Sequence, residues 1–272
     1  MRDRQAFTSG NYTYALLENG MAEILRYTGG DTRELDIPGA LDGHVVKALG
    51  RRSFPNIKGL VRVGIPDSVS LIRRAAFKGC QDLVDVCLPD GLFAIAGSTF
   101  SDCTSLTSIR IPEGVTAIGD RAFADCGSLA KIHLPQSVTA IGESAFFYCV
   151  GLTELHVPKG VNAIGDSAFM DCRRLTDVRL PDGITSIGNS AFQWCSSMTD
   201  LRLPQSVAEI GPIAFCNCRK LKSLNLPESV TTIGNDAFMG CPDLTLAVGR
   251  GSCAEQYCVE NRLNYVYSDT KN

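Results

Sequence analysis

Apolar and polar positions follow one pattern that repeats every 23 residues from Leu60 to Asp243. In the unit 106–128, Ile109 and Ile111 alternate with polar residues, which predicts a short, half-buried strand. Pro112 follows at once and ends the strand, because proline has no N–H to donate to a sheet. Each unit is therefore expected to contribute one strand, and units are numbered below from position 1 at Leu60.

The second half of each unit predicts a return toward the core. Glycine or serine at position 9 suits a turn, and the apolar residues at positions 10 and 13 are expected to point inward. Glycine at position 14, present in six of eight units, allows a sharp bend. The Ala-Phe-x-x-Cys segment that follows is interpreted as one short helical turn with phenylalanine and cysteine on the same face.

Three residue types mark this register without a single insertion. Proline, phenylalanine and cysteine recur eight times each, at Pro66, Pro89, Pro112, Pro135, Pro158, Pro181, Pro204 and Pro227; Phe77, Phe100, Phe123, Phe146, Phe169, Phe192, Phe215 and Phe238; and Cys80, Cys103, Cys126, Cys149, Cys172, Cys195, Cys218 and Cys241. A single unit cannot bury its own apolar face, so the units are expected to stack as coils of a solenoid. At a strand spacing of about 4.8 Å, eight coils would extend roughly 40 Å.

The pattern L-x-x-I-x-L-P-x-x-V-x-x-I-G-x-x-A-F-x-x-C resembles the BspA-like branch of bacterial leucine-rich-repeat proteins. The resemblance covers Leu60 to Asp243; the departures are Arg73 and Ala96 for glycine, Thr99 for alanine and Met198 for leucine. It implies a leucine-rich-repeat solenoid with a parallel β-sheet on one face and short helical turns. The family also implies attachment to host proteins, other cells or surfaces.

The repeat divides the chain into three predicted segments: 1–59, 60–243 and 244–272. The first holds two apolar runs around Glu18-Asn19-Gly20, a β-hairpin of the kind that BspA-like proteins often carry ahead of their repeats. A degraded unit over 44–59, with about five residues looped out before it, completes this N-terminal cap. The last segment predicts a strand over 244–248, a helix capped by Ser252 that continues to Arg262, and a strand over 264–267.

Composition narrows the choice of partner. The formal net charge is −3, without the basic excess of a nucleic-acid-binding protein, and no run of about 18 apolar residues predicts membrane insertion. Met1 to Phe7 does not have the form of a signal peptide. The family resemblance favours a surface or secreted location, whereas an intracellular location remains the alternative.

Twelve cysteines are present, and eight of them fall in the repeat. We interpret these eight as a ladder of small buried hydrophobic residues; disulfides or a metal are the alternatives, but no pairing is specified and no C-x-x-C occurs. Cys87, Cys216, Cys253 and Cys258 lie off the ladder, and Cys87 is expected to face solvent. Free thiols favour a reducing or anaerobic setting.

Motifs of nucleophilic, nucleotide-dependent and zinc-dependent enzymes are absent from the sequence. We expect no catalytic residues, no cofactor and no metal. A metal held by His133 and His156 beside Glu154 is a weaker alternative, because the sequence does not specify a third ligand for it.

We therefore assign recognition of a partner to the exposed residues of the repeat. The residues at one position of all units are called a row. Five neighbouring units carry a basic or histidine side chain at position 5, which faces outward: Arg110, His133, His156, Arg179 and Arg202. This front strip is a candidate site for an acidic protein loop or a glycan. Alternatively, its charges pair locally, Asp177 with Arg179 and Asp200 with Arg202.

A second candidate lies at positions 19 and 20, where Phe147, Tyr148, Met170 and Trp194 replace small or polar residues. Exposed aromatics of this kind mark interfaces; the alternative is that they pack locally. The leading hypothesis is a non-catalytic interaction or adhesion module for a protein or glycan of unknown identity, and the runner-up is an intracellular scaffold or regulatory binding protein.

Overall fold

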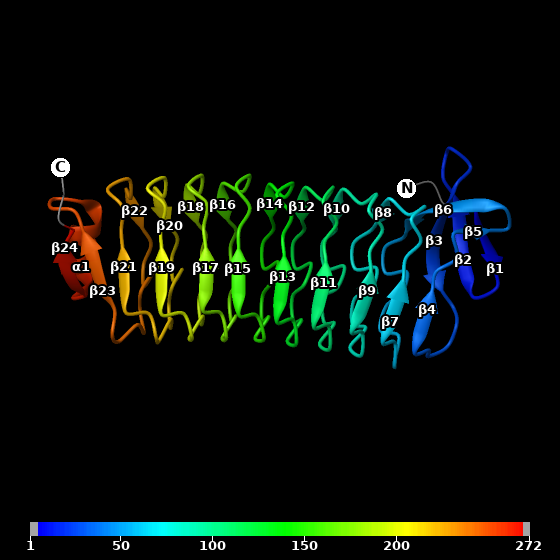
Figure 1. The fold of residues 1–272 in the computed structure, drawn as a ribbon, viewed down its shortest axis with the longest axis horizontal. Helices are drawn as coiled ribbons and strands as arrows, with labels where there is room; N and C mark the ends of the chain where they lie inside the picture. Colours follow the sequence, from blue (N-terminus) through cyan, green and yellow to red (C-terminus); the bar gives the residue numbers. More distant parts are fainter. Residues whose placement is uncertain (1–4, 269–272) are drawn as a thin grey trace.

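The computed structural model describes residues 5–268 and is an elongated solenoid of stacked coils (Figure 1). This confirms the predicted fold class. The predicted segments 1–59 and 244–272 each include residues that lie outside the described range. Within that range the one α-helix is α1 (Cys253–Asn261), whose nine residues are too few to span a lipid bilayer.

The front of the solenoid is a row of parallel strands, one from each coil (Figure 1). Within the eight units each strand occupies positions 3 to 5, and paired residues are offset by 23, as Arg110 and His133 are. The strands of the two caps pair with other offsets, such as 28 from Glu34 to Arg62 and 19 from Thr245 to Asn264. Its members are β4 (Glu34–Asp36), β7 (Arg62–Gly64), β9 (Asp85–Cys87), β11 (Ser108–Arg110), β13 (Lys131–His133), β15 (Glu154–His156), β17 (Asp177–Arg179), β19 (Asp200–Arg202), β21 (Ser223–Asn225), β23 (Thr245–Val248) and β24 (Asn264–Tyr267).

A second row of short parallel strands at positions 12 and 13 was not predicted. These strands are β8 (Leu71–Ile72), β10 (Ala94–Ile95), β12 (Ala117–Ile118), β14 (Ala140–Ile141), β16 (Ala163–Ile164), β18 (Ser186–Ile187), β20 (Glu209–Ile210) and β22 (Thr232–Ile233). Glycine at position 14 lets neighbouring coils approach here, rather than simply allowing a bend. A Cβ on Gly142 would lie 2.6 Å from the backbone nitrogen of Asp120 in the preceding coil.

The Ala-Phe-x-x-Cys segment differs from the expected helical turn. It forms consecutive turns with N–H to C=O bonds between residues three apart, such as Cys126 to Phe123. Positions 16 and 20 both have positive φ in every coil, for example 56° at Arg121 and 63° at Asp125. A right-handed helix cannot contain such residues, so the backbone instead bonds to the next coil, as Phe123 N does to Ala145 O.

The core consists of stacked rows of identical side chains. Ring centroids of successive phenylalanines from Phe54 to Phe238 lie 5.1–5.7 Å apart, with planes within 14°. Tyr27 stacks on the first ring and Tyr257 meets the last edge-on. Seven of the eight ladder cysteines are fully buried, and only Cys241 is partly exposed.

The N-terminal hairpin is present: β2 (Tyr12–Leu16) pairs antiparallel with β3 (Ala22–Tyr27), and β1 (Ala6–Ser9) adds an unpredicted strand. The extra residues before the degraded unit form a second tight hairpin, β5 (Ala40–Leu41) with β6 (His44–Leu49). Because β4 precedes them and pairs with β7, the degraded unit already begins before Pro38 rather than at residue 44.

The C-terminal cap follows the sequence prediction closely. The hydroxyl of Ser252 accepts a hydrogen bond from the Glu255 N–H at 3.1 Å and caps α1, and Arg262 follows the helix in a left-handed conformation. Strands β23 and β24 flank the helix and pair in parallel with each other, so the last strand extends the front sheet.

Candidate functional sites and relatives

The front strip lies where the sequence places it. Its five residues project from β11, β13, β15, β17 and β19, one from each strand, and all are exposed. Register brings Arg110 beside His133 and His156 beside Arg179. The sheet surface therefore presents them in one line along the solenoid.

Much of the charge in this strip is satisfied by neighbours. Asp177 accepts from Arg179 Nη2 at 3.1 Å and lies 3.4 Å from His156 Nε2, and these hydrogen bonds lower the pKa of Asp177. Of the two ion pairs expected within the strip, the Asp177–Arg179 pair forms, whereas within residues 5–268 no ion pair joins Asp200 to Arg202. Exposed pairs of this kind stabilise by only about 0–1 kcal/mol.

His133 and His156 were also considered as metal ligands. In the part of the chain that the structure describes, no group of three His, Cys, Asp or Glu side chains lies close enough together to hold a metal ion.

The second candidate surface is the turn edge, formed by positions 19 to 22 of successive coils. Position 20 has a φ between 57° and 76° in all eight coils. Glycine, aspartate and asparagine tolerate this left-handed conformation best, and they fill six of the eight places: Gly79, Asp102, Asp125, Asp171, Asn217 and Gly240. Tyr148 and Trp194 are the two exceptions.

Each of these two aromatics has an arginine from the next coil above its ring. Arg173 lies 5.7 Å from the centre of the Tyr148 ring, and Arg219 lies 5.4 Å from that of Trp194. Both arginines occupy position 22, which carries arginine in these two coils alone. Phe147 has a similar partner, Arg121, at 5.9 Å. The aromatic surfaces are thus paired with cations, an arrangement that sequence reasoning missed.

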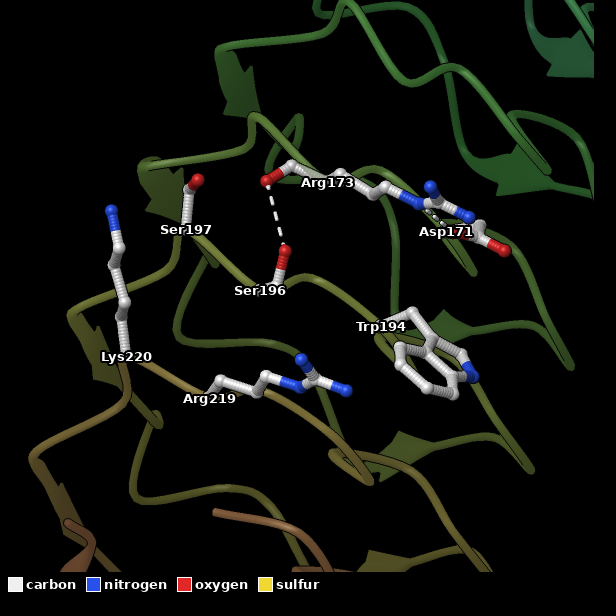
Figure 2. A pocket seen from close by; sticks show the side chains of 7 residues that line it. All are labelled: Asp171, Arg173, Trp194, Ser196, Ser197, Arg219 and Lys220. Carbon is white, nitrogen blue, oxygen red and sulfur yellow. Dashed lines mark hydrogen bonds and ion pairs between the residues drawn. The ribbon is translucent and has the colours of Figure 1, made fainter. Parts of the chain in front are cut away.

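A hollow of about 750 Å³ lies beside Trp194. Figure 2 shows Trp194, Arg173 and Arg219 around this hollow, with Ser196 and Ser197 between the arginines and Lys220 at its rim. Asp171 is the one acid in its lining, and it accepts a 2.6 Å hydrogen bond from Arg173 Nε. Arg219 and Lys220 therefore remain to attract a negatively charged group.

The predicted members of this surface differ in exposure. Tyr148 is 39% exposed, whereas Trp194, Phe147 and Met170 are half-buried. The hollow brings Trp194 together with residues of three coils but does not include Phe147, Tyr148 or Met170. The sequence carried one regularity here, the shared offset of 25 residues from Tyr148 to Arg173 and from Trp194 to Arg219, but its meaning depends on how the coils stack.

The repeat and its geometry agree with a family profile. The profile for the BspA-type leucine-rich-repeat region matches residues 42–153 and 116–245, in six copies. The chain belongs to this BspA-type family. Its membership confirms the resemblance inferred from the repeat, and the solenoid seen here is the expected fold.

Solved structures of similar proteins are also bacterial leucine-rich-repeat proteins. One from T. pallidum is 30% identical, with a TM-score of 0.65, and the match covers 80% of this BspA-type chain and 91% of that one. A leucine-rich cell surface protein from Faecalibacterium prausnitzii is 28% identical, with a TM-score of 0.56, over 98% of this chain and 96% of that one. The search of curated protein sequences gave no significant match.

Proposed function

We propose that this BspA-type chain is a non-catalytic binding module whose turn edge, centred on Trp194, binds an acidic segment of a partner protein. The observation that carries this proposal is the strained placement of Tyr148 and Trp194. Both are held at positive φ in a row otherwise filled by residues that suit it. Tyr148 is exposed and Trp194 half-buried, and neither belongs to the hydrophobic core. Backbone strain at two aromatics that the core does not require supports a functional role.

The chemistry of the hollow favours this class of partner. The indole of Trp194 offers a flat apolar surface, and tryptophan and arginine are common anchors of protein interfaces. Arg219 can bind a carboxylate through two parallel N–H bonds while remaining stacked on the indole. A loop with a carboxylate beside an apolar side chain matches both features.

The front strip is the second candidate, supported by its five aligned residues from Arg110 to Arg202. Its local ion pairs weaken it as a site, since a partner would have to displace them. Glycan binding at either surface remains an alternative to protein binding.

Display at the bacterial surface, with a role in adhesion, is part of the proposal. It is supported by the relative described as a cell surface protein; an intracellular scaffold is the alternative. Protease treatment of intact source cells, followed by mass spectrometry, separates the two. Peptides from residues 60–243 in the released fraction would support surface display, whereas their presence in the lysate alone would support the scaffold.

The hollow carries its own reporter, because Trp194 is the only tryptophan. Titration with a short acidic peptide containing one phenylalanine should change Trp194 fluorescence and saturate. The same peptide with lysine in place of each glutamate should not change it, and Arg219→Gln should weaken the response to the acidic peptide. An equal response to both peptides would contradict recognition by charge.

A further inference from the structure

A separate hollow of about 350 Å³ lies near the N-terminal end of the solenoid, among the turns of the first coils. Five cationic residues line it: Arg51, Arg52, Arg74, Lys78 and Arg121. They come from three coils, so the hollow arises from stacking rather than from one loop. We call it the basic hollow.

Two carboxylates, Asp102 and Asp125, also line the basic hollow, and one of its cations forms an ion pair with Asp102. Lys78 Nζ lies 3.2 Å from Asp102. Burial and the neighbouring Asp102 raise the pKa of Asp125, while the charges of Arg121 and Lys78 oppose that shift. Lys78 is therefore paired inside the hollow, and Asp125 is the carboxylate that the charge of Arg121 acts on.

In the part of the chain that the structure describes, the other three arginines have no such counterpart. Among residues 5–268, no carboxylate forms an ion pair with Arg51, Arg52 or Arg74. With five cations against two carboxylates, the lining carries a charge of +3, whereas the whole chain carries −3. Like charges at close range repel, so this arrangement is most stable with an anion present.

The backbone fixes where these arginines lie. Arg52 has a φ of 51°, at the position that serine fills in four other coils, and its N–H donates to Arg74 O in the next coil. Arg51 and Arg74 share position 15. Farther along that row, Asp120 and Asp166 bond through Oδ1 to the backbone N–H of Glu143 and Asn189 in the next coil. Aspartates in this row thus serve the backbone, whereas the arginines of the first coils do not.

We propose that the basic hollow binds an oxyanion of two or more negative charges, carried as a sulfate or phosphate ester. Guanidinium groups match the oxygens of such groups through paired N–H donors. Coils about 4.8 Å apart place arginines of neighbouring coils at a spacing that one tetrahedral group or two linked ones can bridge. This site is independent of the hollow at Trp194.

Calorimetric titration at low ionic strength tests the site, because exposed charges are screened by salt. The probes are inorganic pyrophosphate and a trisulfated heparin disaccharide. In the test variant, Arg51→Asn, Arg52→Ser and Arg74→Asn are combined, and each replacement is a residue that other coils use at the same position. The matched control combines Lys159→Ala, Arg174→Ala and Lys222→Ala, which removes the same number of exposed charges from outside both hollows and the front strip.

The native chain should bind at least one probe at a single site. Affinity should fall at least about tenfold in the test variant and remain unchanged in the control, since only the first removes charge-assisted hydrogen bonds. The preferred probe identifies the ester. Binding of neither probe, or equal weakening in both variants, would overturn the proposal. A urea unfolding curve checks that the test variant is folded, and Arg52→Ser alone should already weaken binding.

Discussion

At the scale of single residues, the informative positions are those where the chain departs from its own repeat. A left-handed residue with a Cβ costs roughly 1–2 kcal/mol, and asparagine and aspartate reduce this cost by local hydrogen bonding. Trp194 and Tyr148 therefore occupy places where most coils have a more suitable residue. The contacts with their arginine partners offset only part of this destabilisation, because cation–π contacts at exposed sites contribute about 0.5–1 kcal/mol.

The variant Trp194→Asn should consequently leave the free energy of unfolding unchanged or raise it by up to about 1 kcal/mol. Asn217 occupies the same position in the next coil and shows that asparagine fits. Urea denaturation measures the difference. As a control, Phe169→Ala in the buried stack should lower stability by about 3–5 kcal/mol. A loss above about 2 kcal/mol for Trp194→Asn would mean that Trp194 is structural.

The sequence located these aromatics but not their strain. The Ala-Phe-x-x-Cys segment is consistent with a helical turn when only its apolar residues are considered. The glycine, aspartate and asparagine residues of position 20 were the signal for a left-handed backbone. The arginines at position 22 could not be matched to the aromatics without knowing how far one coil shifts against the next.

At the scale of elements, the phenylalanine and cysteine rows act together. Each ladder cysteine donates its thiol to the carbonyl of a phenylalanine in the preceding coil, over 3.1–3.4 Å. The same carbonyl also accepts the N–H of the cysteine in its own coil, as Phe123 O does from Cys126. The thiols therefore do more than fill space, because they join adjacent turns.

This ladder predicts a loss of stability at alkaline pH. Burial raises the pKa of the Cys149 thiol well above its ordinary value of 9.0, and that of Cys80 to about 11. Above pH 9 the unfolded thiols lose protons that the folded ones keep, so the free energy of unfolding should fall. Each thiol can contribute up to about 1.4 kcal/mol per pH unit.

Urea denaturation between pH 7 and pH 10.5 measures this slope. Replacing Cys126, Cys149, Cys172 and Cys195 with alanine should make it shallower, because four titrating groups are removed. Identical slopes in the native chain and in the four-cysteine variant would contradict the assignment of this pH dependence to the buried thiols.

Elements whose signal lies within a short stretch of sequence were predicted, whereas features that depend on contacts between coils were not. The front strands, the capped helix α1 and the N-terminal hairpin follow from short patterns and were predicted. The second strand row was missed because its two residues per coil leave no periodicity to detect. The thiol–carbonyl bonds were missed for a different reason: each depends on contact between residues 26 apart.

At the scale of the whole molecule, the constant separation of 23 residues between equivalent positions determines both the stacking of the coils and the surfaces they form. Equivalent residues of adjacent coils pair at a separation of 23 throughout the regular repeats, so each coil contacts mainly its two neighbours. The surfaces arise from the same stacking, since both hollows are lined by residues of several coils. For this reason the composition of each exposed row could be predicted, but the hollows between rows could not.

Removal of one complete coil, residues 106–128, should therefore leave a folded protein. Position 23 of one unit would still precede position 1 of another, so the stack closes with one interface fewer and lower stability. Small-angle X-ray scattering should show a maximum dimension shorter by about 5 Å. Removal of residues 106–117 alone should abolish cooperative unfolding, because half a coil breaks the register; a folded product would argue against stacking by coils.

The central claim is that the turn edge at Trp194 binds a partner protein. Its most direct test is quantitative affinity capture from source cells, using three immobilised proteins: the native chain, a turn-edge variant with Tyr148→Asn and Trp194→Asn, and the front-strip variant with Arg110, Arg179 and Arg202 changed to alanine. Proteins captured by the native chain should be retained by the front-strip variant and lost from the turn-edge variant. Undiminished capture by the turn-edge variant, with loss from the front-strip variant, would contradict the account and assign recognition to the sheet.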